Sequence, residues 1–205
     1  MRKCRRSLIN ASLLVAGALL TQPSSEAAAA NPCDPIIAGS RGQMRSKAFR
    51  TRTVMTTPGT AEVRIVSEYL LPDRVRLLRD REETVAIRGK GTFTRRAGQS
   101  WQKSAVDMSE MIGSVTDPGT MEQLARDYVK SDCKLIGSDS VGGKAMTVYQ
   151  YKVTGEELSA VNKVWLGVAD NLPYKLEIES LYAGQKSKTV QTVEYDPAIK
   201  IEAPQ

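Results

Sequence analysis

The stretch AEVRIVSEYLLPDRV, residues 61–75, decides the fold of this chain. Up to Glu68, residues of one parity are small or apolar and those of the other are mostly charged, a period of two that places one face of a strand on a core and the other toward water. Pro72 cannot donate a ladder hydrogen bond, so the strand ends there, and the alternation returns in 74–77. The stretch therefore predicts two antiparallel strands joined by a turn.

Other segments show the same alternation of apolar and polar residues. Further strands are predicted at 82–87, 89–95, 100–103, 134–138, 145–151, 161–168, 174–180 and 188–195, the first strand of all begins near Phe49, and Ile199 and Ile201 form a final extended piece. This gives about ten or eleven strands in total. A twisted sheet of that size tends to curl or close, because an open edge exposes unpaired backbone groups.

The middle of the chain changes period. Apolar residues recur at helical spacing in 106–112 and in 120–129, and Asp117-Pro118-Gly119 between them is a turn. Two short amphipathic helices are therefore predicted to interrupt the sheet and cover it. Residues 31–47 are rich in Gly, Pro and polar residues and are predicted to form a short lead-in. The predicted fold class is mainly β (α+β).

The first thirty residues have the parts of a secretory signal peptide. Arg and Lys gather before residue 7, an apolar run covers 8–20, and the alanines of 27–30 suit cleavage near Ala29 or Ala30. The run is well short of the roughly 20 residues that a membrane-spanning helix needs. Residues 30–32 do not form the motif that precedes a lipid-anchored cysteine. We therefore expect 31–205 to work as one periplasmic domain without stable membrane insertion.

Charge and composition limit partners and chemistry. Without residues 1–30, 25 Lys and Arg stand against 22 Asp and Glu, a net charge of +3. This small, scattered excess makes nucleic acid an unexpected partner. The chain has no histidine, which removes Ser-His-Asp and Cys-His nucleophiles, His-rich zinc sites and the commonest general base. We expect no enzyme activity, no metal and no cofactor.

One catalytic alternative survives the lack of histidine. Carboxylates gather on the two predicted helices, at Asp107, Glu110, Glu122 and Asp127. A paired-carboxylate hydrolase could use such a cluster. Solvated helix faces explain the same residues without chemistry. An exported hydrolase stays open as the weaker alternative.

Two cysteines remain once Cys4 leaves with the signal peptide. The single available pairing joins Cys33 to Cys133, and export to an oxidising compartment favours it. The two cysteines do not form a C-x-x-C motif, so a structural disulfide is favoured over a redox pair. The crosslink ties the lead-in to the middle of the chain.

Four segments resemble those of a known family. They read EYLLPDRV at 68–75, GKAMTVY at 143–149, WLG at 165–167 followed by NLPYK at 171–175, and YDPAIKI at 195–201. Together they are similar to the LolA-like superfamily of periplasmic lipoprotein and lipid carriers (LolA, LolB and LppX-like proteins), over residues 47–204. The resemblance implies a strongly curved antiparallel sheet, an unclosed half-barrel, whose concave apolar side lies under helices and accepts acyl chains. The chain departs from the carrier in its disulfide and in the Pro- and Gly-bearing stretch before Phe49, which stands where the carrier has a long N-terminal helix.

The residues expected to line the ligand cavity and its lid are apolar or aromatic: Trp101, Met108, Met111, Ile112, Met121, Leu124, Tyr128, Tyr149 and Trp165. Methionine suits ligands of variable shape because its side chain is flexible and polarisable, although apolar residues at helical spacing also simply pack a helix. We expect a monomeric, non-catalytic protein that binds acyl chains of a lipid or lipoprotein. The alternative is an envelope regulatory or scaffolding module that recognises a partner protein with the same surface.

Overall fold

The computed structural model describes residues 31–109, 117, 119–120, 131–155 and 158–204. Its elements are α1 (Asp34–Arg45), β1 (Ala48–Thr56), β2 (Val63–Leu70), β3 (Arg74–Arg79), β4 (Glu82–Ile87), β5 (Gly91–Arg96), β6 (Gln102–Lys103), β7 (Ser131–Val141), β8 (Lys144–Thr154), β9 (Leu158–Gly167), β10 (Pro173–Tyr182) and β11 (Gln185–Tyr195). Each strand predicted from alternation overlaps one of these. The final piece around Ile199 and Ile201 is not a strand.

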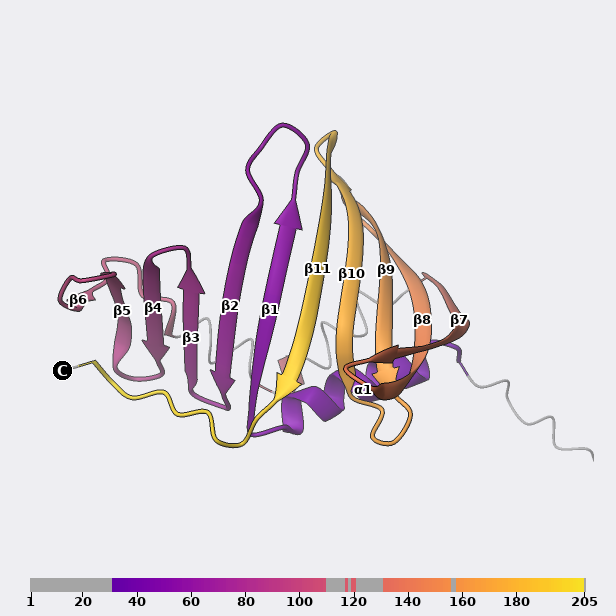
Figure 1. Cartoon of the computed structure of the whole chain (residues 1–205), viewed down its shortest axis with the longest axis horizontal. Helices are drawn as coiled ribbons and strands as arrows, with labels where there is room; N and C mark the ends of the chain where they lie inside the picture. Colours follow the sequence, from indigo (N-terminus) through magenta and orange to yellow (C-terminus); the bar gives the residue numbers. More distant parts are fainter. Residues whose placement is uncertain (1–30, 110–116, 118, 121–130, 156–157, 205) are drawn as a thin grey trace, which may run out of the picture.

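The eleven strands of the described residues form one antiparallel sheet. Its order is β6-β5-β4-β3-β2-β1-β11-β10-β9-β8-β7, so two meanders meet where β11, the last strand of the chain, pairs with β1, the first. Figure 1 shows that the sheet is strongly curved and that its edge strands, β6 and β7, lie far apart. The predicted fold, a mainly β, strongly curved and unclosed antiparallel sheet, is confirmed.

Helix α1 occupies most of the segment that we expected to be only a lead-in, so that expectation was wrong. Pro35 lies in the first turn, where a missing N–H costs no helical hydrogen bond, and Asp34 and Arg45 complement the helix dipole at either end. Gly39 is required by a close approach: a Cβ there would lie 2.7 Å from the Asn171 carbonyl oxygen. The glycines that weaken the helical pattern in sequence therefore let α1 lie close to the sheet.

The two helices predicted in 106–112 and 120–129 lie largely outside the described residues. Of the first segment the structure describes 106–109, and of the second Thr120 alone. Among the described residues α1 is the one helix with stated bounds. The sequence-based count of two covering helices therefore differs from what the structure describes.

Among the described residues, three clusters of buried side chains hold the fold together. The first joins α1 to the sheet through Cys33, Ile36, Cys133, Val164 and Leu166, and it contains the predicted disulfide, whose Cα atoms lie 5.3 Å apart. The second joins the C-terminal segment to the β4 end of the sheet through Ala48, Val85, Ile87, Ile199 and Ile201. The third consists of Met146, Val148, Trp165 and Tyr174. The disulfide thus fastens α1 to β7.

Candidate functional site

The strand register assigns each side chain to one of two faces. Directly opposed residues of antiparallel strands point to the same face. One row of opposed residues crosses the sheet from β8 to β5: Tyr149, Val164, Leu176, Gln191, Thr53, Ile65, Arg79, Glu82 and Arg96. Helix α1 packs on this face at Val164 and Leu166. We call it the helix face, and the opposite one the outer face.

The helix face is built almost entirely from uncharged side chains. The next two rows hold Val193, Thr51, Ser67, Leu77, Thr84 and Thr94, and then Tyr195, Phe49, Tyr69, Val75, Ala86 and Thr92. Within the register-paired parts of the described strands, Arg79, Glu82 and Arg96 are the only charged residues on this face. The face is therefore lined by apolar and hydroxyl-bearing side chains. Its charged residues lie together in one row, on β3, β4 and β5.

Two tyrosines of the helix face have hydroxyl groups whose pKa is raised by burial. Burial raises the pKa of Tyr151 to about 12. Burial also raises the pKa of the Tyr69 hydroxyl above its ordinary value, although the neighbouring hydroxyl groups of Ser67 and Thr51 oppose the shift. Both shifts have the sign expected for an acid whose charged form loses solvation. Around these two tyrosines the surroundings are therefore less polar than water.

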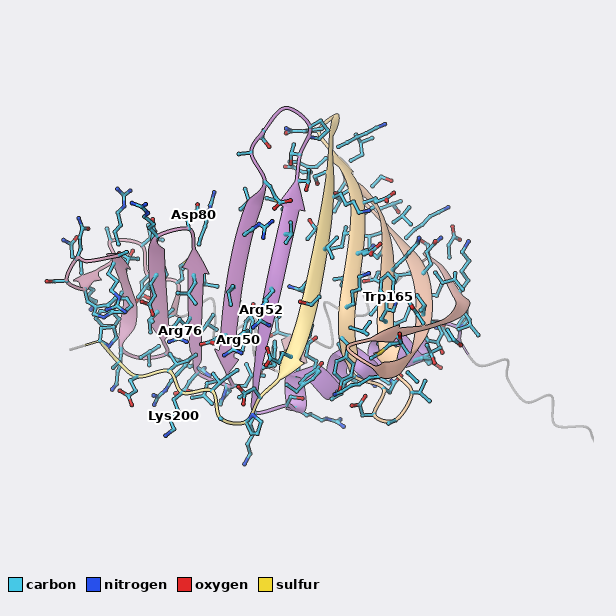
Figure 2. All side chains as sticks on the ribbon, viewed as in Figure 1. Arg50, Arg52, Arg76, Asp80, Trp165 and Lys200 are labelled. Atoms are coloured by element: carbon cyan, nitrogen blue, oxygen red, sulfur yellow. A yellow bond between two sulfur atoms is a disulfide. The ribbon has the colours of Figure 1, made fainter. Side chains whose placement is uncertain are left out.

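A hollow of about 880 Å³ opens on the helix face where β3, β4 and β5 reach their turns. Ile65, Leu77 and Thr84 supply its uncharged part, and charged residues from the strand ends and the β3–β4 turn surround them: Arg79, Asp80, Arg81, Glu82 and Arg96. In Figure 2, Asp80 marks this end of the sheet. The volume lies in the range of small-molecule sites. The hollow thus combines an apolar patch with a charged rim.

The outer face has the opposite character, because its charges neutralise one another. Figure 2 shows Arg50, Arg52 and Arg76 on this face. Arg50 reaches Glu68 at 2.7 Å and Glu194 at 3.2 Å, and Arg76 also pairs with Glu68. The alternation in 61–75 correctly assigned Glu68 to the face opposite Ile65, but its expected contact with water was wrong, since the side chain is only 4% exposed. On this part of the outer face the arginines and glutamates therefore form a structural ion-pair network.

The structure does not bring together the predicted ligand residues that it describes. Tyr149 lies on the helix face against the first cluster. Trp165 lies on the outer face in the third cluster, and Trp101 packs against the second cluster beside a separate hollow of about 430 Å³. The Met108 N–H donates to Thr92 Oγ1 at 2.8 Å. None of these four lines the larger hollow, and Met111, Ile112, Met121, Leu124 and Tyr128 lie outside the described residues.

Trp165 is fixed in place by polar contacts. Its indole N–H donates to Asp139 Oδ2 at 2.7 Å, and the Lys175 ammonium lies 4.2 Å from the ring centroid. The indole hydrogen bond, with a second from the Ser140 N–H, lowers the pKa of Asp139 below its ordinary value. These contacts explain the buried tryptophan without a ligand.

The lowered pKa of Asp139 gives a pH-dependent signal. The hydrogen bond to Trp165 is fully present above the ordinary carboxyl pKa and is lost as pH falls through the lower folded-state value. In a Trp101→Phe background, we expect tryptophan emission to stay constant down to about pH 3.8 and to change only below it. Asp139→Asn should abolish that change. A transition centred above pH 4.5, the ordinary value for glutamate, would contradict the assignment.

The described residues give no support to the alternative of a paired-carboxylate hydrolase, because Asp107 is the one proposed carboxylate among them. Asp107 accepts hydrogen bonds from the Ser109 N–H at 2.9 Å and the Thr92 hydroxyl at 3.1 Å, and these lower its pKa. Glu110, Glu122 and Asp127 lie outside the described residues. In the described part of the chain, no group of three or more Cys, Asp or Glu residues could hold a metal ion. Asp107 thus caps a local turn.

The hollow was missed by sequence reasoning although its residues lie in segments correctly predicted as strands. Ile65, Leu77 and Arg79 stand in the alternating stretch and the strand after it. The alternation in sequence could have placed these three residues on a common face, because all of them lie on the face opposite Glu68. The missing information was the register, because the hollow also needs Arg96 from β5, two strands beyond β3.

Solved structures share this fold, a curved and unclosed antiparallel sheet whose largely uncharged face lies under a helix. Among solved structures, the lipoprotein LppX of Mycobacterium tuberculosis matches with a TM-score of 0.58 and 10% identity, over 83% of this chain and 98% of LppX. LprF of Mycobacterium bovis matches with a TM-score of 0.56 and 10% identity, over 82% and 95%. At this identity the likeness concerns the fold alone. No protein-family model and no curated protein matches the sequence.

No helix in the described part of the chain is long and apolar enough to cross a membrane. The Cys33–Cys133 disulfide that the sequence predicted is present.

Proposed function

We propose that this protein is an exported, non-catalytic binding protein that holds an acyl chain of a lipid or lipoprotein on the helix face of its sheet. The observation that carries the proposal is the sidedness of the sheet: register-paired charges gather on the outer face, and the helix face is uncharged as far as the hollow at the ends of β3–β5. LppX, whose fold this chain shares, is a lipoprotein, which supports a setting at the cell envelope.

Apolar burial supplies the binding energy in this proposal. Each methylene removed from water contributes roughly 0.8 kcal/mol. A chain of about a dozen methylenes can therefore offset the cost of losing its translational and rotational freedom. The threonines and serines of the helix face are small and uncharged, so an acyl chain that lies on them buries no charged group.

Adjacent leucines on β3 give a matched test. Leu77 lines the hollow on the helix face, whereas Leu78 points to the outer face. We expect Leu77→Asn to weaken binding of a fluorescent fatty acid by about tenfold, because an apolar contact is lost, and Leu78→Asn to leave the affinity unchanged. Binding is measured by fluorescence titration, with thermal unfolding of both variants as the control for folding. Equal losses in both variants, or no saturable binding to the unsubstituted protein, would contradict the proposal.

We also propose that residues 1–30 are a cleaved signal peptide and that the protein works as one periplasmic domain, 31–205. The disulfide supports an oxidising compartment. N-terminal sequencing of the exported protein should begin near Asn31. Retention of Met1 on the exported chain would overturn this part of the proposal.

A second function, recognition of a partner protein, is supported by the edge strand β7. In the described part of the chain β7 pairs with β8 alone, and its Leu135 and Ile136 are 61% and 43% exposed. Such an edge can accept a strand from another protein. Crosslinking in the envelope would distinguish the two functions: a protein partner crosslinked at β7, with no co-purified lipid, favours this second one.

A further inference from the structure

We propose that the hollow at the ends of β3–β5 binds the acidic headgroup of the ligand, so that the ligand is an anionic, single-acid amphiphile such as a free fatty acid. This inference rests on the proposed function, because it places the polar end of the molecule whose acyl chain lies on the helix face. It assigns the headgroup to the guanidinium groups of Arg79, Arg81 and Arg96.

The charge at the hollow is placed where the rest of the face has none. Arg79, Glu82 and Arg96 are direct neighbours in one row across β3, β4 and β5. The charged part of the row ends at the uncharged Ile65 of β2, and Leu77 and Thr84 belong to the row beside it. An amphiphile bound along the face would therefore have its acyl chain among uncharged residues and its headgroup among charged ones.

The arginines of the hollow differ from those of the outer face in their pairing. On the outer face, Arg50, Arg76 and Arg95 each form an ion pair with a glutamate. Among the described residues, no ion pair within 4 Å involves Arg79, Arg81 or Arg96. Their donors are thus available to a ligand that supplies carboxylate or phosphate oxygens, which guanidinium groups bind in a bidentate manner.

The carboxylates at the hollow set the charge that a ligand can carry. Asp80 and Glu82 stand against the three arginines, which leaves one cation in excess among the residues that line the hollow. A single acidic group balances that excess, whereas a headgroup with several negative charges would meet Asp80 and Glu82. The hollow therefore favours a monoanionic headgroup.

The experiment compares two fluorescent probes that differ only at the headgroup: a fatty acid and its methyl ester, both below their critical micelle concentrations. We expect the acid to bind about tenfold more tightly than the ester. This ratio corresponds to one additional charge-assisted hydrogen bond in the complex with the acid. The double substitution Arg79→Gln, Arg96→Gln should reduce the affinity for the acid to that for the ester and leave the ester unchanged. Arg64→Gln, an exposed arginine on the outer face, is the matched control.

Each other outcome has a distinct meaning. Equal binding of acid and ester to the unsubstituted protein overturns the headgroup assignment and leaves the acyl-binding function intact. No saturable binding of either probe overturns the proposed function itself. Acetate at the probe's own concentration should not displace the fatty acid. Displacement by acetate would show a simple anion site and would also overturn the inference.

Discussion

We expect the Cys33→Ser, Cys133→Ser double variant to lose about 4 kcal/mol of unfolding free energy. The disulfide joins residues 100 positions apart, so it removes a large loop-closure entropy from the unfolded chain. It also belongs to the cluster that packs α1 onto β9. Urea unfolding of the oxidised protein and of the variant measures the difference.

The reductant provides the control for the disulfide. Dithiothreitol should lower the urea midpoint of the unsubstituted protein to that of the double variant and should not shift the variant. A loss smaller than about 1 kcal/mol would show that α1 is held by packing alone. The structural role of the crosslink would then have to be abandoned.

Glu68→Gln is the second large expected effect, a loss of about 3 kcal/mol. Removing one partner of a buried ion pair costs roughly 3–5 kcal/mol, because the remaining charge stays uncompensated. The lower end applies here, since Arg50 and Arg76 remain 23% and 32% exposed and keep part of their hydration. Chemical denaturation measures the loss, with circular dichroism to confirm the native secondary structure.

Glu194→Gln is the matched control for Glu68. Glu194 pairs with Arg50 and Arg52 on the same face but is 48% exposed, and exposed pairs are worth at most about 1 kcal/mol. Burial, and not the number of arginine partners, is therefore expected to decide the size of the effect. Similar small losses in both variants would contradict the view that Glu68 anchors the outer face.

The strands could be predicted from sequence because each is short and alternates with period two. Residues 82–87 were predicted with the bounds that the structure has, and the turns after Leu71 and Arg79 carry strong local signals. The missed element was α1, whose glycines weaken the helical pattern. Its stability depends on packing against Leu166 and on the disulfide, both of which are tertiary.

The sequence predicts the character of the site, an apolar face, but not the residues that line it. The alternation and the family resemblance predict an apolar face, and the aromatic residues predicted to line it include Trp101 and Trp165. Trp101 and Trp165 instead lie on the outer face. One sequence does not tell which parity of each strand faces the helix, because that depends on the register across β1 and β11, strands at opposite ends of the chain.

The central claim is that ligands lie on the helix face of the sheet, and a photoreactive fatty acid tests it most directly. After irradiation of the complex, mass spectrometry locates the label, with and without an excess of unlabelled fatty acid. We expect label that the excess displaces at helix-face residues of β2–β4, namely Ile65, Leu77 and Thr84. Displaceable label confined to outer-face residues such as Val66 or Leu78, or no displaceable label at all, would contradict the account.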